Sequence, residues 1–566
     1  MNDVSIVLCG EAGQGIQTVE QLFTKIVKKA GFNVFSTKEY MSRVRGGSNS
    51  TQLRISTEPV NAFINRIDIL ITLSEDAVKH LGNRVSEKTI IIGEKNHIKN
   101  NKKSEVFEIS FSQLAKEIGN IVFSNTIAVG LLSAICNIDK KIINERVENF
   151  FSKKKKNLVK NNILAAEKGY NVGYDIVKKG KIRINISGTK KQNNDIVLNG
   201  TQAIGLGALA GGCNFISSYP MSPSTGVLTF LSQKSNDFDI IVEQAEDEIS
   251  AINMSLGAWY AGAVAMVTTS GGGYALMTEG VSLAGMIESP IVIHLSQRPS
   301  PATGLPTRTE QADLEQALYS SHGEFPKIIF APGTIQEGFY LTQKAFNLAD
   351  KYQVPVYILT DQYFVDSYYN IPPMKPDGII NTNYFVKTKK NYKRYELTKN
   401  GISPRGIPGY GNGLICVDSD EHDEEGHITE STIIRTKMVN KRLRKLKEII
   451  KETLPPKLIG NKNYKTLIIG WGSTYHIIKE ALEKINIKNI SFLHFIQIYP
   501  IHPNTLKYLN KAEKTIIIEN NATSQFSKLI RLQTGYEINH KILQYNGLPF
   551  DVETVEKQIK QILRGE

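Results

Sequence analysis

The stretch AVAMVTTSGGGY, residues 263–274, indicates the fold of the central part of the chain. Its first half is apolar and β-branched, as in a buried strand, and its second half is a glycine turn. Further apolar strands are expected at Ile240–Val242, Ile291–Leu295 and Val356–Thr360, with helices between them. Strands and helices that alternate in this way predict an α/β fold with a doubly wound parallel sheet covered on both faces.

The chain has 566 residues, more than one hydrophobic core usually supports, so several domains are expected. A strand, a glycine turn and a helix at Val4–Ala30 begin an N-terminal α/β domain, and a basic stretch ends it. A proline-rich segment separates the central domain from a last α/β domain. The predicted parts are an N-terminal domain (1–178), a linker (179–195), the central domain (196–368), a connecting segment (369–435) and the last domain (436–566).

The composition is that of an ordinary globular protein, with 41% hydrophobic and 22% charged residues. The four cysteines, Cys9, Cys136, Cys213 and Cys416, form no CxxC pair, so the chain offers no local ligand set for zinc or an iron–sulfur cluster. So few thiols, and an N-terminus unlike a signal peptide, predict a reducing, cytoplasmic location. No apolar run reaches the roughly 18 residues of a membrane span.

The formal net charge is +13, which is a feature of many nucleic-acid-binding proteins. However, the basic runs Lys153–Lys156 and Lys441–Lys447 lack interleaved aromatic residues and match no nucleic-acid-binding motif. Both runs are therefore expected to be solvated faces. The alternative is attraction of an acidic protein partner such as ferredoxin.

Two glycine-containing turns stand out in the N-terminal domain. Gly10–Ile16 joins a strand to a helix, but Ala12 replaces the second glycine of the dinucleotide-binding fingerprint and no GK[ST] follows. It is either a tight turn or an anion site at the helix N-terminus. Arg43–Ser48 holds two arginines beside a turn, which suits a phosphate or carboxylate, a surface loop or a contact between chains equally well.

Three polar segments follow strands of the central domain, where ligands bind in open α/β sheets. Ser218–Thr225 packs hydroxyl groups together, and Gln297–Gln311 carries arginines and threonines that suit a carboxylate substrate. Val242–Glu248 places four acidic residues after an apolar strand; an acidic helix start is one explanation, and a buried carboxyl with a perturbed pKa is the other. The glycines of Thr268–Tyr274 leave a surface free of side chains for a flat ring.

The Tyr219–Pro223 turn, the Glu243–Asn253 segment and the Gln297–Leu314 loop together resemble the alpha subunit of 2-oxoacid:ferredoxin oxidoreductases, particularly of the 2-oxoglutarate type. Gly13–Gly15 and Arg45–Gly47 resemble the gamma subunit of that family, fused in front. The resemblance spans nearly the whole chain. It implies coenzyme A-dependent oxidative decarboxylation of a 2-oxoacid, 2-oxoglutarate to succinyl-CoA being the expected reaction, with electrons passed to ferredoxin.

The resemblance also implies roles for single residues around thiamine diphosphate. Glu246 is similar in position to the catalytic carboxyl that hydrogen-bonds the pyrimidine ring and promotes formation of the nucleophilic ylid. Tyr219, Pro220, Gly271 and Gly272 are the other expected cofactor contacts, in what resembles the family's pyrimidine-binding domain.

For the substrate, the resemblance implies that Arg298 pairs with the 2-oxoacid carboxylate while the hydroxyls of Ser222 and Thr307 orient it. The family's Tyr-Pro-Ile-Thr-Pro turn differs here at Met221 and Ser222. These departures leave the choice of substrate more open than the class of reaction.

The chain has no Gly-Asp-Gly motif for a diphosphate and its magnesium ion, and Asp377–Gly378 is the nearest approach. The diphosphate site, Mg²⁺ and a [4Fe–4S] cluster are therefore expected on a separate beta subunit, in an (αβ)₂ assembly. Glu421–His427 is expected to be a turn rather than a metal site. The last domain, with Gly470–Ser473 and Glu519–Asn521, resembles the transketolase C-terminal domain, with a structural and interfacial role or a part in docking coenzyme A.

Three alternatives remain. The chain could belong to a thiamine enzyme without a redox step, although the gamma-like domain argues against this. The substrate could be pyruvate or a branched-chain 2-oxoacid. The chain could also be a non-catalytic scaffold that binds a nucleotide or acyl-CoA.

Overall fold

The computed structural model describes residues 3–11, 14–42, 47–98, 104–180, 182, 184, 186, 188–189, 194–375 and 383–565. The predicted linker lies partly outside this range, and Ala12, Gly13, Arg43–Gly46 and Asp377–Gly378 lie wholly outside it. The chain divides into two compact units. Unit 1 comprises Met1–Leu198, Asp366–Pro373 and Asp551–Glu553, and unit 2 comprises Asn199–Val365, Met374–Phe550 and Thr554–Glu566.

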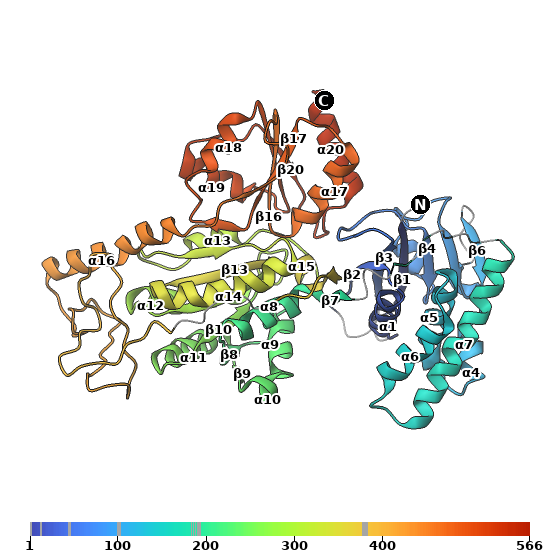
Figure 1. Ribbon diagram of the computed structural model, residues 1–566, viewed down its shortest axis with the longest axis horizontal. Coiled ribbons are helices and arrows are strands. Elements are labelled where there is room, and N and C mark those ends of the chain that lie inside the picture. Colours follow the sequence, from blue (N-terminus) through green and yellow to red (C-terminus); the bar gives the residue numbers. More distant parts are fainter. Residues whose placement is uncertain are drawn as a thin grey trace. The chain divides into compact units, whose positions relative to one another are not determined.

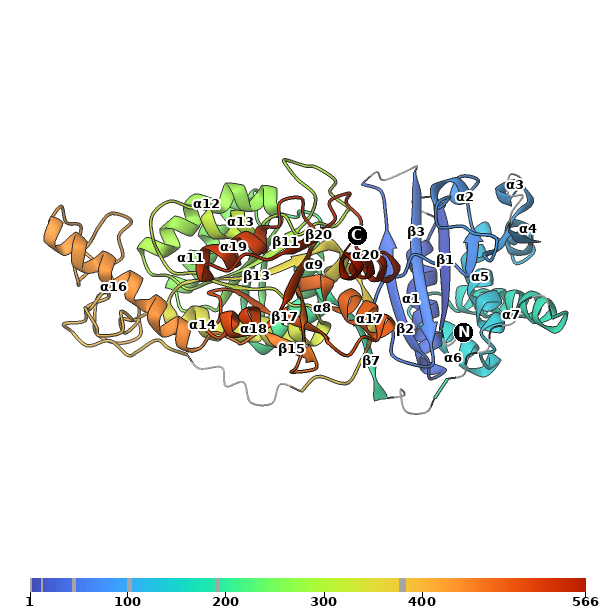
Figure 2. The ribbon, with the colours of Figure 1, turned by 90° about the horizontal axis from the view of Figure 1, so that it is seen from above.

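In the described part of unit 1, eight strands form one mixed sheet in the order β6-β5-β4-β1-β3-β2-β14-β7 (Figures 1 and 2). β1, β4, β5 and β6 run parallel, whereas β3 is antiparallel to both β1 and β2. The strands are β1 (Asp3–Glu11), β2 (Asn33–Glu39), β3 (Ser48–Ser56), β4 (Ile69–Thr72), β5 (Ile90–Gly93), β6 (Glu105–Glu108), β7 (Ile196–Asn199) and β14 (Tyr368–Ile371).

The helices of unit 1 bury apolar faces against this sheet and against one another. Two of them, α5 (Ser124–Ile135) and α7 (Lys156–Lys178), pack backbone to backbone: a Cβ atom added at Gly130 would lie 2.0 Å from the Ala166 carbonyl oxygen, so only glycine fits there. The remaining helices are α1 (Ile16–Lys29), α2 (Ala77–His80), α3 (Lys95–Ile98), α4 (Phe111–Lys116), η1 (Ile121–Phe123) and α6 (Lys140–Phe151).

Unit 2 contains the predicted doubly wound sheet. Its described strands have the order β18-β12-β13-β11-β10-β8-β9, and every pair except the antiparallel β12–β18 is parallel. Every residue of β10, β11 and β13 is buried, as apolar runs covered on both faces should be. The strands are β8 (Phe215–Ser218), β9 (Ile241–Gln244), β10 (Ala265–Thr269), β11 (Ile291–Gln297), β12 (Ile328–Phe330), β13 (Pro355–Asp361) and β18 (Gln497–Tyr499).

Helices connect the strands of this sheet and cover its faces (Figure 1). α8 (Gly200–Ala210) begins with a capping box between Asn199 and Gln202, and α14 (Ile335–Tyr352) begins with one between Thr334 and Glu337. The others are α9 (Thr225–Ser232), α10 (Ser235–Phe238), α11 (Glu248–Tyr260), α12 (Gly271–Met286), α13 (Leu314–Tyr319) and α15 (Gln362–Asp366).

The last part of the chain forms a second sheet within unit 2. Its described strands have the order β15-β17-β16-β19-β20, with β15 antiparallel and the others parallel. These strands are β15 (Lys457–Gly460), β16 (Thr466–Trp471), β17 (Ile490–Phe495), β19 (Lys514–Glu519) and β20 (His540–Leu543). The helices are η3 (Gly472–Thr474), α17 (Tyr475–Ile485), α18 (Thr505–Lys511), α19 (Gln525–Thr534) and α20 (Val552–Arg564).

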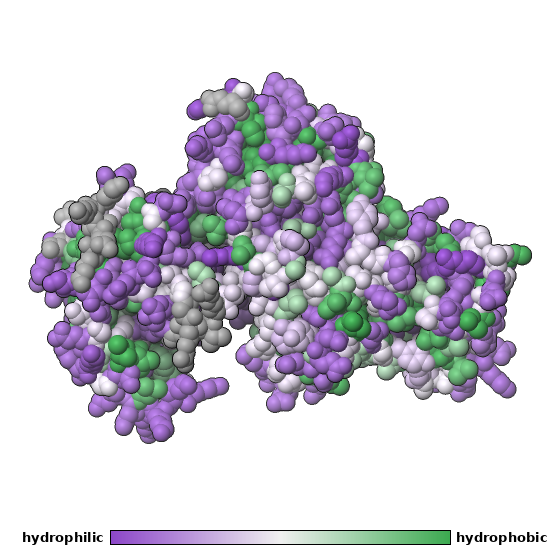
Figure 3. Space-filling view, turned by 180° about the vertical axis from the view of Figure 1, so that it is seen from behind, coloured by the Kyte–Doolittle hydropathy of each residue, from purple (hydrophilic) through white to green (hydrophobic). Residues whose placement is uncertain are grey.

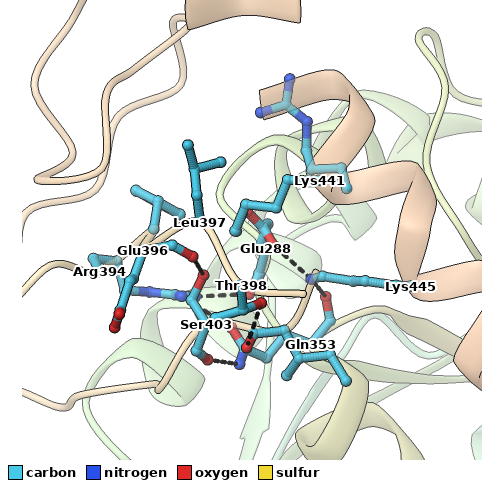
Figure 4. A network of polar contacts seen from close by, with 12 residues as sticks. Glu288, Gln353, Arg394, Glu396, Leu397, Thr398, Ser403, Lys441 and Lys445 are labelled. Carbon is cyan, nitrogen blue, oxygen red and sulfur yellow. Dashed lines mark hydrogen bonds and ion pairs between the residues drawn. The ribbon is translucent and has the colours of Figure 1, made fainter. Parts of the chain in front are cut away.

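The expectation that both basic runs are solvated is wrong for the second run. Lys153–Lys156 is exposed, but Lys441 and Lys445 on α16 (Thr432–Lys451) are only 0% and 1% exposed. Both ammonium groups form ion pairs of 2.5 Å with the carboxylate of Glu288, which is itself buried (Figure 4). The two lysines are four residues apart and therefore share one face of the helix.

The same cluster holds the connecting segment against the rest of unit 2 (Figure 4). Arg394 donates to the Glu288 carbonyl oxygen at 2.8 Å and to Gln353 Oε1 at 2.9 Å. Gln353 in turn donates to the Ser403 carbonyl oxygen at 2.7 Å. The lysines hold the pKa of Glu288 well below its usual range, although burial alone would raise it.

The face drawn in Figure 3 is mainly hydrophilic, with separate small hydrophobic patches. Among the described residues, no helix has the length and apolar character needed to cross a membrane.

Candidate active site

Four neighbouring parallel strands of unit 2, β9, β8, β10 and β11, end at one edge of the sheet. The segments predicted to carry chemistry all begin there, because each follows one of these strands. The contacts confirm that two of them meet: Arg298, after β11, donates through Nη1 to the carbonyl oxygen of Ser222, after β8, at 2.6 Å. Strand order therefore brings together segments about 75 residues apart in the sequence.

Two hydrogen bonds hold the turn after β8 in place. The Ser218 hydroxyl donates to the Thr268 carbonyl oxygen on β10, and Ser224 Oγ donates to the Met221 carbonyl oxygen at 2.7 Å. The Ser222–Pro223 peptide is cis. Tyr219 and Ser222 are exposed at this turn and Pro220 is half-buried, so the turn presents an aromatic ring and a hydroxyl outward.

The acidic run after β9 divides into different environments. Asp247 is the N-cap of α11 and accepts a hydrogen bond from the Ser250 amide at 2.7 Å. Glu248 is buried, its Oε1 has no hydrogen-bond partner among the described residues, and burial raises its pKa. Glu246, the residue assigned the catalytic role, is exposed in this chain by itself, as is Glu243. The prediction of a buried carboxyl with a perturbed pKa is thus confirmed, and that carboxyl belongs to Glu248 rather than to Glu246.

The glycines after β10 each have a different neighbour. A Cβ added at Gly271 would lie 2.6 Å from both carboxyl oxygens of Asp313, and one at Gly273 would lie 2.4 Å from Glu248 Oε1. At Gly272 the nearest atom would be the Ala302 carbonyl oxygen, at 3.7 Å. Gly272 is also exposed, so the expected surface free of side chains is present at this position.

The loop after β11 carries a buried arginine. Arg298 is 8% exposed, its Nε has no hydrogen-bond partner in the described part of the chain, and burial lowers its pKa. Glu310 and Asp313, further along the loop, are also buried. Thr307 is half-buried in the same loop, and among the described residues no hydrogen bond joins it to Ser222 or Arg298.

The far end of this loop is bound to the last sheet. The Gln311 amide donates to the Asn520 carbonyl oxygen at 2.7 Å, and the Asn521 side chain donates to the Gln311 carbonyl oxygen at 3.0 Å. Gln311 Nε2 also donates to the Trp471 carbonyl oxygen at 3.0 Å. The Gly470–Ser473 and Glu519–Asn521 segments therefore hold the loop in place, a role that the sequence alone did not assign to Gln311.

Unmet hydrogen-bonding groups concentrate at this sheet edge. Glu248 Oε1, Ser270 Oγ, Arg298 Nε and Asp313 Oδ2 are all buried, and within the described residues none has a hydrogen-bond partner. Buried polar groups without partners are rare in folded proteins and are expected where a ligand or ordered water binds. The edge of the sheet therefore has the chemistry of a binding site.

Within the described ranges, no group of three or more His, Cys, Asp or Glu side chains could hold a metal ion. Three of the four cysteines are buried, and all four are free thiols. Glu421–His427 is a turn, as predicted: His422 is buried and Glu421 forms ion pairs with Arg435 and Arg442.

In unit 1 the predicted gamma-type motifs lie partly outside the described residues. In the first turn Gln14 and Gly15 are described; Gly15 is left-handed (φ 78°) and is the N-cap of α1. A cavity of about 420 Å³ adjoins this turn at the carboxyl ends of β4 and β5. It is lined by Gln14, Thr72, Leu73, Glu94, His97, Phe111, Ser112, Ile121, Val122, Ser124 and Asn125.

Comparison with known proteins gives the family. Residues 206–441 match the family described as pyruvate flavodoxin/ferredoxin oxidoreductase, thiamine diphosphate-binding, and residues 5–172 match pyruvate ferredoxin/flavodoxin oxidoreductase. The alpha subunit of a Sulfolobus 2-oxoacid:ferredoxin oxidoreductase is 31% identical over 99% of this chain and 97% of its own length. The 2-oxoglutarate synthase subunit KorA of Methanocaldococcus jannaschii is 31% identical over 57% of this chain and 88% of its own.

A solved structure agrees over the full length. The 2-oxoglutarate:ferredoxin oxidoreductase from Magnetococcus marinus, with 2-oxoglutarate, coenzyme A and succinyl-CoA bound, superposes with a TM-score of 0.92 at 29% identity and covers 99% of both chains. The chain therefore belongs to the alpha subunits of the 2-oxoacid:ferredoxin oxidoreductases, enzymes that use ferredoxin as electron acceptor.

Proposed function

We propose that this chain is the alpha subunit, with a gamma-type domain in front, of an enzyme that converts 2-oxoglutarate and coenzyme A to succinyl-CoA and carbon dioxide while reducing ferredoxin. The observation that carries the proposal is Arg298, a buried guanidinium with an unmet donor at the carboxyl edge of the sheet, hydrogen-bonded to the carbonyl oxygen of the exposed Ser222. The Magnetococcus marinus enzyme, with 2-oxoglutarate and succinyl-CoA bound, and the KorA relatives, which are 2-oxoglutarate synthase subunits, favour 2-oxoglutarate among the 2-oxoacids.

The described residues fit the pyrimidine end of thiamine diphosphate. Gly272 offers open backbone surface, the Tyr219 ring is exposed beside it in the sheet order, and the Glu246 carboxyl is free to meet a ring nitrogen. Gly271 and Pro220 complete the expected contacts. When bound, thiamine diphosphate supplies the carbon nucleophile that attacks the 2-oxo group.

Four site residues of this chain have defined roles in the proposed reaction. The Glu246 carboxyl shares a proton with the pyrimidine nitrogen. This role requires that a partner chain shield the carboxyl from water. Arg298 binds the substrate carboxylate, and the hydroxyls of Ser222 and Thr307 orient the 2-oxo group. Because Glu246 is exposed in the isolated chain, the site is complete only when another subunit covers it.

That subunit is the beta chain. The described part of this chain offers no carboxylate cluster for Mg²⁺, and its cysteines are too far apart in sequence to suggest a [4Fe–4S] site. We therefore assign the diphosphate site, the magnesium ion and the cluster to the beta subunit, in an (αβ)₂ assembly. Ferredoxin docks on that assembly.

The test is to co-express the chain with its beta subunit and follow reduction of a low-potential dye with coenzyme A and one 2-oxoacid at a time. Reduction with 2-oxoglutarate and not with pyruvate or branched-chain acids is expected. Reduction with pyruvate and no other acid would show that the substrate is pyruvate and would leave the proposed class of reaction unchanged. No reduction with any acid, by enzyme that contains thiamine diphosphate and iron, would overturn the proposal.

Glu246→Gln tests the catalytic role. The amide cannot hold the required proton, so turnover should fall at least ~100-fold. Glu243→Gln is the matched control, since Glu243 is also exposed and lies three residues away on the same segment. Equal activities of the two variants would remove Glu246 from the reaction.

A further inference from the structure

Asp313 occupies a position that normally caps a helix, but it does not cap one. It directly precedes α13, and its side chain makes no capping hydrogen bond. Its amide is held by Gln297 Oε1 at 3.0 Å, and its carboxyl group lies against Gly271 at the start of α12. Gly271 leaves room for both carboxyl oxygens, since any Cβ there would lie 2.6 Å from each. A capping role therefore does not explain this aspartate.

Asp313 is buried, and in the described part of the chain one of its two carboxyl oxygens has no hydrogen-bond donor beside it. The residue is 3% exposed, and its Oδ2 has no hydrogen-bond partner among the described residues. Burial, and to a smaller extent the charge of Glu310, raise the pKa of Asp313 to about 7, even though Arg298 acts to lower it. An aspartate of this kind changes its charge near neutral pH.

A second buried aspartate, at the end of a strand of the same domain, provides the contrast. Asp361, at the end of β13, accepts hydrogen bonds from the Ser473 hydroxyl and from the Phe364 amide at 2.8 Å. Its oxygens are therefore matched by donors, whereas Oδ2 of Asp313 is not. Burial raises the pKa of Asp361 as well, to about 6.

The charged groups around Asp313 are few. Arg298 and Glu310 interact with it from its own loop. From α11, Glu248 reaches Gly273, two residues beyond Gly271. From the last sheet, Glu519 is bonded to Asn521, Ser524 and the amides of Phe526 and Ser527 rather than to this loop.

We propose that Asp313 is a positioning residue for Arg298 and makes binding of the 2-oxoacid depend on pH. When Asp313 is ionised, its charge offsets that of the Arg298 guanidinium, and the substrate carboxylate meets a weaker field. When Asp313 carries a proton, the full charge of Arg298 is available to the substrate. This inference rests on the proposed role of Arg298 in binding the substrate carboxylate.

Binding of the substrate is therefore linked to binding of a proton by Asp313. Above neutral pH, each 2-oxoacid bound to Arg298 repels the Asp313 carboxylate and favours uptake of one proton from solvent. Glu310 increases the effect, because its charge also opposes ionisation of Asp313. The dependence should appear in KM, since the groups invoked act on binding.

The experiment measures KM for 2-oxoglutarate in the assembled enzyme from about pH 5.5 to 9, where the substrate stays ionised. For the natural chain KM should rise about tenfold, centred near pH 7, which corresponds to a shift of one unit in the pKa of Asp313 on binding. Asp313→Asn should make the profile flat. Glu310→Gln should move the midpoint to lower pH, because it removes a neighbouring negative charge.

Asp361→Asn is the matched control and should keep the natural profile. A rise in KM that persists in Asp313→Asn, or that disappears in Asp361→Asn instead, would overturn the proposal. Failure of the proposed function looks different: the natural enzyme would oxidise no 2-oxoacid, or Arg298→Met would leave KM unchanged. Glu310→Gln supplies an independent reading if Asp313→Asn does not fold.

Discussion

Two clusters of buried charge in unit 2 differ in how their charges are matched. Under α16, the Glu288 carboxylate forms ion pairs with both Lys441 and Lys445. Glu288 Oε2, Arg298 Nε and Asp313 Oδ2 are all buried without a hydrogen-bond partner among the described residues, but Glu288 Oε2 has an ion-pair partner at 2.5 Å. At the sheet edge, no ion pair within 4.0 Å joins Arg298 and Asp313 in the described part of the chain. Matched buried charge holds segments together, whereas unmatched buried charge is typical of a site that acts on a ligand.

The largest expected effect is on the matched cluster. Glu288→Ala leaves Lys441, Lys445 and Arg394 buried together without their counter-ion, and should lower the free energy of unfolding by about 3–5 kcal/mol. Chemical denaturation measures this. Glu324→Ala, at an exposed glutamate of the same unit, should change it by less than about 0.5 kcal/mol. A loss below about 1 kcal/mol for Glu288→Ala would contradict the view that this cluster stabilises the fold.

Arg298→Met should affect function more than stability. It removes the charge that meets the substrate carboxylate, so kcat/KM for the 2-oxoacid should fall about 30–100-fold, or about 2–3 kcal/mol. Steady-state kinetics of the assembled enzyme give this value. Arg308, whose side chain packs against Gly547, is the control from the same loop, and Arg308→Met should change kcat/KM less than about threefold. If both variants lose activity equally, the loop is sensitive to any change and Arg298 has no special role.

Asp313→Asn should have the opposite sign from Glu288→Ala. The pKa of Asp313 is raised from 3.8 to about 7 in the folded chain, so between about pH 4 and 7 the folded state holds a proton that the unfolded state has released. Stability of the natural chain should therefore fall as pH rises through this window. The asparagine variant lacks this loss and should gain about 2–3 kcal/mol relative to the natural chain between pH 5 and pH 8. Chemical denaturation of both proteins at pH 5 and at pH 8 tests this prediction. If the variant and the natural chain differ in free energy of unfolding by the same amount at both pH values, ionisation of Asp313 plays no part.

The smallest effect is expected for Lys445→Met. Burial lowers the pKa of Lys445 to about 8, which means that its charge is costly to hold. Glu288 would keep Lys441 and the neighbouring Arg394 as counter-charges, so the free energy of unfolding should change by no more than about 1 kcal/mol. A loss as large as that of Glu288→Ala would mean that all three charges are needed together.

Much of the fold could be predicted from local sequence, because buried strands are apolar runs. The strand predicted at Ile291–Leu295 is β11, which runs two residues further, and the strand predicted at Val356–Thr360 is β13, which is one residue longer at each end. β18 was missed because it is three residues long and exists through its pairing with β12. A strand of this kind has no local signature.

The lysine run was misjudged for a related reason. A charged residue read by itself is expected in water, and the counter-ion Glu288 lies about 150 residues from Lys441. The spacing of Lys441 and Lys445 showed that they share a helix face, but nothing nearby identified an anion for them. Non-local charge pairing is not encoded in a short window of sequence.

The candidate site could be predicted in part for the same reason as the strands, because its segments have a local sequence pattern. Polar segments after apolar strands located the edge correctly and included Ser222 and Arg298, which the structure brings into contact. Asp313 was missed because an aspartate before a short helix is usually a cap. The choice of Glu246 rests on resemblance and stays a prediction, since burial within this chain distinguishes Glu248 instead.

The pairing of β18 with β12 limits how the gene can be divided. β18 comes from the last part of the chain but completes the central sheet, so a protein truncated before Gln497 would leave β12 as a bare edge. An uncovered edge strand with buried, apolar residues is a template for pairing between molecules, and such a truncated protein should aggregate. The central and last domains are therefore expected to be produced, inherited and engineered as one piece.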